Sequence, residues 1–168
     1  MGCGHDKLPG SIGVDRSAET LADVVHDLDS FPWPFQDHEF DVIRCQDVLE
    51  HLDDFVRVME ELHRIAKPDA EIRIRVPHFS SVQAYTDPTH RHFFSTDSLQ
   101  YFVAGSPYPH YTAVRFRQQS VRLTMWRPHR LVGLEFLANR WPLRYEKMFA
   151  FLFPSQFLEF VIRPVPPS

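Results

Sequence analysis

Residues 77 to 94 concentrate side chains that bind metals or move protons. The segment reads P-H-F-S-S-V-Q-A-Y-T-D-P-T-H-R-H-F-F and contains His78, Asp87, His90 and His92. Imidazole and carboxylate groups are zinc ligands, and a neutral imidazole can take a proton from a substrate hydroxyl. Because the helical H-E-x-x-H spacing is absent, we favour a general base, His90 before His78. There are two alternatives. One is a metal site formed by His78, His90 and His92, and the other is a polar turn with a purely structural role.

A third candidate base is His51, within the stretch D-V-L-E-H-L at residues 47 to 52. It follows Glu50 near the start of an expected helix. Its interpretations are substrate contact, proton acceptance or a hydrogen bond at the helix terminus. Cys45 ends an apolar run just before this stretch, which favours a small core residue over a nucleophile.

The chain starts with two glycines around one cysteine, Gly2 to Gly4. Glycines let a ligand approach the backbone, and exposed N–H groups can hold a carboxylate or phosphate. Asp15 ends the short run S-I-G-V-D. At the carboxyl end of a strand, such an acid can accept hydrogen bonds from both hydroxyls of a ribose.

The hydrophobic pattern predicts an α/β sheet that positions these groups. Residues 47 to 66 have helical periodicity, with Asp53 or Asp54 as a cap and Lys67-Pro68 as the end. Strands are predicted at 11–15, 24–28, 40–45, 71–76 and 158–163 and, in the less regular second half, within 113–125. Further helices are predicted at 96–103, 130–138 and 144–151. Strand, helix and strand in succession imply parallel pairing with a right-handed crossover.

Length and composition exclude several classes of protein. The chain has 168 residues, the size of one domain, and 18 basic against 22 acidic residues give a net charge of −4. Such a charge is atypical of a general nucleic-acid binder. The arginines between residues 115 and 130 then indicate a solvated face or an anionic substrate. No apolar run reaches the roughly 18 residues of a membrane span. The first residues lack a secretory pattern, so we expect a cytoplasmic, bacterial-type protein.

The order of the motifs resembles that of small class I methyltransferases of the "type 11" family, which use S-adenosyl-L-methionine. The family pattern P-F-x-D-x-x-F-D matches residues 34 to 41, and its V-L-E-H-L matches residues 48 to 52. Its K-P-G-G corresponds to K-P-D-A at residues 67 to 70. The resemblance implies a Rossmann-like, doubly wound, mostly parallel sheet.

The same resemblance assigns roles along a single domain of residues 1–168. Residues 1–77 form the cofactor-binding half, and residues 78–168 form a substrate-side insertion with the closing strands. The glycine turn holds the methionine end of the cofactor, Asp15 holds the ribose, and residues 27 and 28 hold the adenine. The implied cofactor contacts are Gly2, Gly4, Asp15, Asp27, Leu28, Cys45 and Gln46.

The chain departs from the family at its start. In the family the glycine turn follows a first strand, whereas only Met1 precedes Gly2 here, and residues 5 to 10 cannot hold the first crossover helix. We therefore expect a flexible turn and weak cofactor binding, unless upstream residues or another segment take the strand's place.

The predicted function is transfer of a methyl group to a small-molecule or glycan acceptor, with proton removal by a histidine. A homodimer is compatible with this reading. The alternatives are an inactive binding protein with this fold, a metal-dependent enzyme using the three histidines, or a nucleic-acid methyltransferase. Q-D-V-L after Cys45, in place of an N-P-P-Y motif, argues against methylation of base amino groups.

Overall fold

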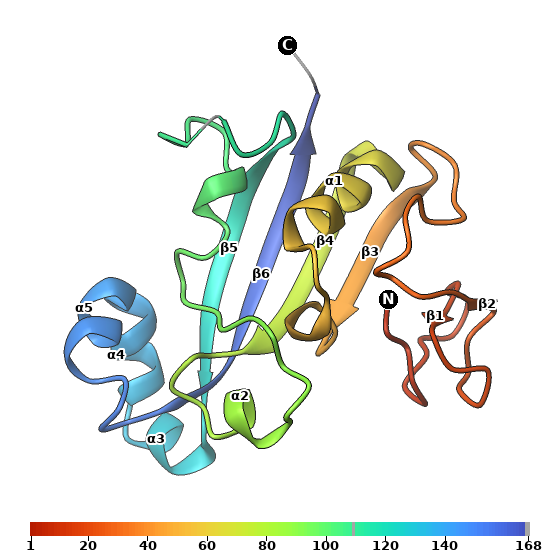
Figure 1. Cartoon of the computed structure of the whole chain (residues 1–168). Helices are drawn as coiled ribbons and strands as arrows, with labels where there is room; N and C mark the ends of the chain where they lie inside the picture. Colours follow the sequence, from red (N-terminus) through yellow and green to blue (C-terminus); the bar gives the residue numbers. More distant parts are fainter. Residues whose placement is uncertain (109, 167–168) are drawn as a thin grey trace.

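The computed structural model describes residues 1–108 and 110–166. Figure 1 shows the arrangement of the elements. The strands are β1 (Val14–Asp15), β2 (Val24–Val25), β3 (Phe40–Gln46), β4 (Ala66–Pro77), β5 (Arg115–Met125) and β6 (Ser155–Val165). The α-helices are α1 (Phe55–Ile65), α2 (Gln83–Thr86), α3 (Arg127–Leu131), α4 (Leu134–Arg140) and α5 (Pro142–Met148), and two 3-10 turns are η1 (Leu49–His51) and η2 (Gln100–Phe102).

Four strands form the main sheet in the order β3-β4-β6-β5. β3 and β4 pair in parallel, with Ile43 opposite Ile72, and β6 is antiparallel to both β4 and β5. Alternate residues of the central strands, such as Ile72, Ile74 and Phe160, are buried in the core. The Rossmann-like α/β class is confirmed, with a mixed sheet, and the strands predicted at 40–45, 71–76 and 158–163 lie in it.

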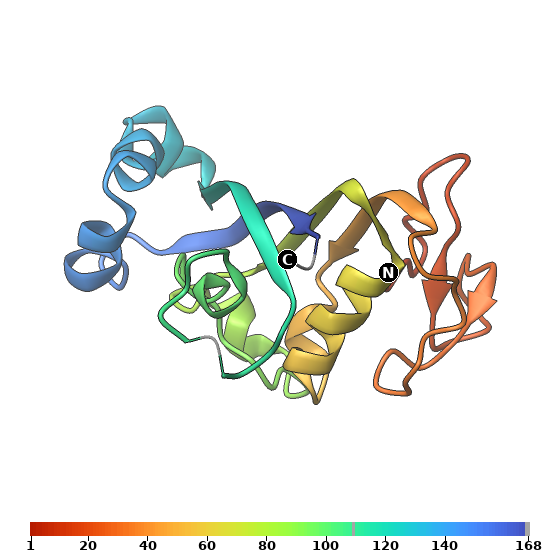
Figure 2. The same ribbon diagram turned by 90° about the horizontal axis from the view of Figure 1, so that it is seen from above.

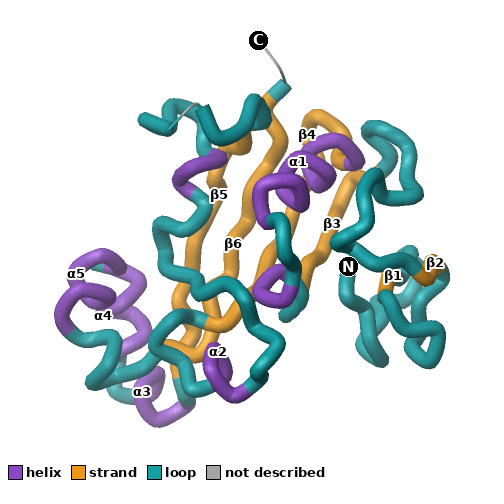
Figure 3. The backbone as a smooth tube through the Cα atoms, in the orientation of Figure 1, coloured by secondary structure: helices purple, strands orange, loops and turns teal. Residues whose placement is uncertain are grey.

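The first two predicted strands do not join that sheet. β1 and β2 are only two residues each and pair in parallel with one another, Val14 opposite Val24. Figure 3 shows this small sheet beside the free edge of β3, with the N-terminal residues close to it. The prediction of one continuous sheet through residues 11–15 and 24–28 is therefore wrong. No strand among the described residues pairs with both β1 and β3 to join the sheets.

The predicted helix at 47–66 is shorter in the structure. It begins at Phe55, after Asp54 accepts a hydrogen bond from the backbone N–H of Arg57 at 3.1 Å, and it ends at Ile65. Residues 49 to 51 form the separate turn η1 instead, and Ala66 already belongs to β4. The cap is one of the two predicted, and the buried face of α1 is the predicted apolar stripe, including Met59, Leu62 and Ile65.

Figure 2 shows α1 and α2 on the same face of the main sheet. The opposite face carries Arg73, which is exposed, and Arg75, which is partly exposed. α3, α4 and α5 lie at one end of the molecule (Figure 1). The predicted helix at 130–138 is interrupted by Gly133 with φ +81°, and that at 96–103 reduces to η2. Among the described residues, no helix has the length and apolar character needed to cross a membrane.

Candidate active site beside the end of β3

The glycine turn is fixed between the two sheets. The amino group of Met1 donates to the carbonyl of Arg44 on β3 at 2.8 Å, and the N–H of Cys3 donates to the carbonyl of Val14 on β1 at 3.0 Å. The N–H of Gly4 donates to the Asp15 carboxylate at 2.9 Å. The expectation of an unanchored turn is therefore wrong, because residues 1 to 4 hydrogen-bond to both neighbouring strands.

Gly2 brings this turn against the chain that follows β3. Its φ is +58°, and a Cβ added there would lie 2.7 Å from Cβ of Val48, so both conformation and space demand glycine. Val48 directly precedes η1. The predicted cofactor turn and the V-L-E-H-L motif are therefore in contact.

The other predicted cofactor residues lie at the ends of β1, β2 and β3. Besides Gly4, the Asp15 carboxylate accepts the N–H of Ser17 at 3.0 Å, so backbone amides hold it in place. Asp27 is exposed, whereas Leu28 is buried and its carbonyl accepts the indole N–H of Trp33 at 3.0 Å. Asp27 is therefore accessible to a ligand, whereas the Leu28 side chain belongs to the core beneath it.

Cys45 and Gln46 at the end of β3 differ in accessibility. The Cys45 thiol is fully buried, and burial raises its pKa to about 11, so it is a neutral core group. That burial agrees with a core residue and leaves only the backbone of Cys45 for contact with a cofactor. Gln46 is partly exposed and accepts a hydrogen bond from Arg44 through its side-chain oxygen.

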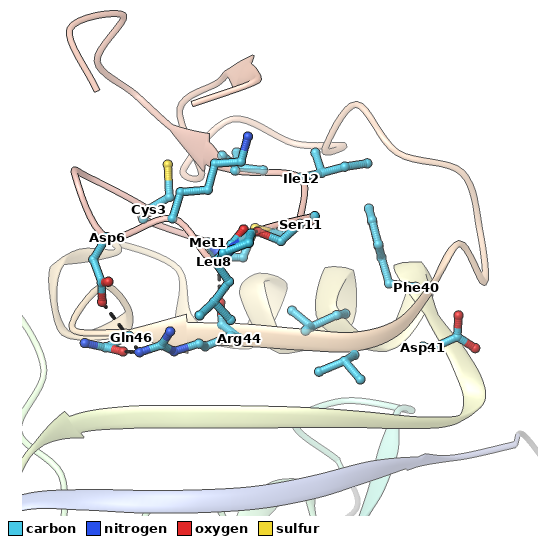
Figure 4. Close-up of a pocket in the computed structure, with 18 of the residues that line it drawn as sticks. Met1, Cys3, Asp6, Leu8, Ser11, Ile12, Phe40, Asp41, Arg44 and Gln46 are labelled. Carbon is cyan, nitrogen blue, oxygen red and sulfur yellow. Dashed lines mark hydrogen bonds and ion pairs between the residues drawn. The ribbon is translucent and has the colours of Figure 1, made fainter. Parts of the chain in front are cut away.

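A cavity of about 510 Å³ runs along the free edge of β3. In Figure 4, Met1, Leu8 and Ile12 lie above it, while Phe40 and Arg44 come from β3 below. An Arg44–Asp6 ion pair of 3.7 Å crosses from the strand to the N-terminal segment. Asp15, Asp27 and Leu28 do not line this cavity. It therefore lies beside the predicted cofactor side, in the gap between the two sheets.

Three side chains converge next to the turn formed by η1. Glu50 and His51 come from η1, and His90 comes from the loop after α2. One ligand atom from each side chain lies within 4.8 Å of the others. The ring centroids of the two histidines are 4.6 Å apart, and Nε2 of His90 is 4.0 Å from Oε1 of Glu50. The Glu50 carbonyl fixes the loop, because it accepts the N–H groups of residues 91 and 92 at 2.7 and 3.2 Å.

The hydrogen-bond network assigns the same tautomer to both histidines. Nδ1 of His90 lies 3.1 Å from the carbonyl of Ala84, which only accepts, so Nδ1 carries the proton. The Thr89 hydroxyl donates to Asp87 at 2.6 Å and must therefore accept from Nδ1 of His51 at 2.9 Å. In this tautomer the Nε2 atom of each ring carries the lone pair that can bind another partner.

Glu50 is a buried carboxyl group whose ion-pair neighbour among the described residues, His90, lies beyond hydrogen-bond distance. It is 1% exposed, and neither carboxylate oxygen has a hydrogen-bond partner among the described residues. Burial raises its pKa to about 7. Burial, followed by the neighbouring His90, lowers the pKa of His51. At neutral pH the cluster therefore holds at least one uncharged imidazole beside a carboxyl group poised to titrate.

Not all the predicted histidines belong to this cluster. His78 is fully buried, with Nδ1 2.7 Å from the Ser80 hydroxyl and Nε2 3.2 Å from Glu146. Nε2 of His92 lies 2.7 Å from the carbonyl of Leu52. In the described part of the chain, His78, His90 and His92 do not form a metal-sized group. Residue-by-residue reasoning missed Glu50, although it precedes His51 in the same motif.

Comparison with known proteins finds a similar family for the first half of the chain. Residues 3–74 match the family model described as "Methyltransferase domain". The first half of the chain is therefore similar to methyltransferase domains. The proteins with a similar fold include ones described as SAM-dependent methyltransferases. The matched range includes Gly4 of the glycine turn, Asp15, Asp27 and the Glu50–His51 pair, and it begins one residue after Gly2.

Solved structures with a similar fold extend over nearly the whole chain. A SAM-dependent methyltransferase from Archaeoglobus fulgidus has a TM-score of 0.60 at 18% identity, covering 90% of this chain and 75% of that protein. A Haloferax volcanii methyltransferase, solved with the Trm112 methyltransferase activator, has 0.59 at 16%, covering 92% and 72%. The YcgJ protein from Bacillus subtilis has 0.55 at 14%, covering 94% and 82%. The search of curated proteins gave no match.

Proposed function

We propose that this protein transfers the methyl group of S-adenosylmethionine to a hydroxyl group of a small-molecule or glycan acceptor. The observation that supports this is the free Nε2 of His51, held beside the contact between the cofactor turn and Val48. A hydroxyl is a poor nucleophile until its proton is removed, and an imidazole at this position can remove it. An amine acceptor needs a base less, since its neutral form already carries a nucleophilic lone pair.

Each group of the chain has a separate role in this proposal. The backbone turn at Gly2–Gly4, Asp15 and Asp27 hold the cofactor, which supplies a methyl group on an activated sulfonium. As the acceptor oxygen bonds to the methyl carbon, the carbon–sulfur bond breaks and its electron pair passes to sulfur. The acceptor proton goes to Nε2 of His51 and then to water.

We assign proton acceptance to His51 before His90. His90 has a side chain only 7% exposed and lies against Glu50, so it is the less accessible of the two. The lowered pKa of His51 keeps its ring neutral at pH 7, which a base requires. The sequence alone ranked His90 first. We place His51 first because it is the more accessible of the two.

The surface near the cluster suits a ring-shaped acceptor. Tyr85, in α2, and Phe93 are 61% and 50% exposed, and their rings stack with centroids 5.0 Å apart. Tyr85 follows Ala84, the residue that fixes His90, and Phe93 lies three residues beyond His90. Exposed aromatic faces bind apolar ring surfaces while leaving polar groups in water. This pair therefore supports a sugar or another cyclic alcohol as the acceptor.

The test is methyl transfer from radiolabelled S-adenosylmethionine to matched panels of cyclic alcohols and cyclic amines. We expect alcohols to be methylated. We also expect His51→Gln to lower kcat by about 100-fold or more, which is the usual rate contribution of a general base. The KM for the cofactor should change little. His110→Ala, an exposed histidine outside the cluster, is the matched control.

Two outcomes would overturn the proposal. One is transfer to amines only, and the other is full activity of His51→Gln on alcohols. Binding of S-adenosylmethionine with no transfer to either panel would instead favour the inactive binding protein.

A further inference from the structure

The Glu50–His51–His90 cluster is built as a ligand set, and we propose that it binds one divalent transition-metal ion of the zinc class. The catalytic part of this inference rests on the proposed function, because the bound ion would activate the acceptor hydroxyl. The binding part rests only on the cluster. Two imidazoles, one carboxylate and an open position form a ligand set found in catalytic zinc sites.

The three ligand atoms lie within 4.8 Å of one another, so small side-chain movements would bring them to the spacing of a metal site. Ligands about 2.0–2.2 Å from zinc lie roughly 3.3–3.6 Å from each other at the tetrahedral angle. The 4.0 Å separation between Nε2 of His90 and Oε1 of Glu50 is too long for a hydrogen bond and slightly longer than this range. A movement of either ligand atom by about half an ångström, through a small side-chain rotation, would bring this pair within the range for a shared ion.

The second layer of contacts presents the lone pairs that a metal needs. Metal-binding histidines usually donate the other ring N–H to a carbonyl or carboxylate, which fixes the tautomer. Here His90 donates to the carbonyl of Ala84, and His51 donates to Thr89, whose hydroxyl is in turn bonded to Asp87. Both Nε2 atoms are thereby left as acceptors.

Glu50 provides the independent observation. A carboxyl group that is 99% buried normally has hydrogen-bond partners, because an unpaired buried polar group costs about 1–3 kcal/mol. Both of its oxygens lack them among the described residues. A cation bound to this carboxylate and to the two Nε2 atoms would satisfy all three groups at once.

With the ion bound, the acceptor hydroxyl becomes the fourth ligand. A bound divalent ion would lower the pKa of such a hydroxyl, so the ion would replace proton transfer to His51 as the step that activates the acceptor, and the proton would be released to water. Magnesium is excluded by the donor set, since it prefers oxygen ligands.

The binding test is calorimetric titration of the untagged, chelator-treated protein with Zn²⁺ and Co²⁺. We expect one ion per chain with a micromolar or lower dissociation constant. Glu50→Gln and His90→Ala should each weaken binding by more than about 100-fold, beyond the usual effect of an outer-layer contact. His110→Ala should bind like the original protein. Mg²⁺ should give no saturable heat.

Glu50→Gln keeps the test decisive, because it removes a buried charge and should fold, as checked by its thermal transition. Equal affinity in Glu50→Gln, or no saturable binding by the original protein, would overturn the metal site. Methyl transfer that survives complete chelation would also refute the catalytic use of the ion while leaving the proposed function intact. Metal binding without any methyl transfer would support the metal site but refute the proposed function, and with it the catalytic use of the ion.

Discussion

Two glutamates, the buried Glu50 and the partly buried Glu146, each face a histidine, but only one of these pairs is joined by hydrogen bonds. Oε1 of Glu146 accepts Nε2–H of His78 at 3.2 Å and the N–H of Thr96 at 2.7 Å. Oε1 of Glu50 lies 4.0 Å from Nε2 of His90, and neither of its oxygens has a hydrogen bond in the described residues. The same two residue types therefore serve opposite purposes in one fold.

The pKa of each glutamate records this difference. Burial alone would raise the pKa of Glu146, but hydrogen bonds from His78 and Thr96 outweigh it and hold the pKa below its usual value. At Glu50, burial dominates and raises the pKa to about 7. A satisfied pair stabilises the fold, whereas an unsatisfied pair costs stability that only a ligand or proton can return.

Replacing each glutamate by methionine should separate the two pairs most clearly. Glu146→Met leaves the Nε2–H of His78 and the N–H of Thr96 buried and unpaired, which should cost about 3–5 kcal/mol of unfolding free energy. Glu50→Met removes an unpaired group and should leave stability at pH 7.5 unchanged or raised. Urea unfolding measures both. Similar losses in the two variants would contradict the distinction.

The pH dependence of stability should show the next largest effect. Between the unfolded pKa of Glu50, about 4.5, and its folded value of about 7, the folded chain holds a proton that the unfolded chain releases. Its contribution to the unfolding free energy therefore falls as pH rises through this window, by about 3 kcal/mol, and is constant above it.

Glu50→Gln should abolish that contribution, so the difference in unfolding free energy between variant and original should grow from pH 4.5 to 7. Glu146, with its lowered pKa, contributes in the other direction, and its share of stability should be lost as pH falls below 4.5. Chemical unfolding at several pH values tests both signs. A pH-independent difference for Glu50→Gln would show that Glu50 does not titrate in this window.

Asp15 offers a third case, a carboxylate held by backbone amides but still partly accessible. Asp15→Ala should weaken S-adenosylmethionine binding by about 1.5–3 kcal/mol, the worth of hydrogen bonds to a charged group. Part of the loss would come from release of the N–H of Gly4. Calorimetry with the cofactor measures it, and an unchanged affinity would remove Asp15 from the cofactor site.

Much of the fold was predictable because it depends on local pattern. The alternation in residues 71–76 and the apolar stripe of α1 each specify one buried face, and the structure follows both. The split between β1 and β3 was not predictable from strand patterns. It depends on which strands meet, and a two-residue pairing such as Val14–Val24 leaves almost no periodic signal.

The candidate site was predictable only in part for a similar reason. His51 and His90 were identified by residue type, but their meeting depends on hydrogen bonds from the Glu50 carbonyl to loop residues 91 and 92, which lie far along the chain. His78 looked equivalent to His90 in sequence, and only burial and the Glu146 contact separate them. Partners from distant elements decide which histidine stays free.

The smallest expected effect concerns Thr89, a positioning residue for His51. Thr89→Val removes the acceptor of the His51 Nδ1–H but keeps the shape of the side chain, and the site is exposed, so stability should fall by no more than about 1 kcal/mol. Nε2 and Nδ1 of His51 should then share the proton, which nitrogen-15 NMR of the ring detects directly. Methyl transfer should fall about tenfold, because part of the population lacks the free Nε2 lone pair.

His78 should keep its tautomer in the same spectrum, since Ser80 and Glu146 fix both of its nitrogens. An unchanged His51 tautomer in Thr89→Val would mean that something other than Thr89 orients this ring. The contrast between His51, with one unpaired ring nitrogen, and His78, with both ring nitrogens hydrogen-bonded, would then lose its structural basis.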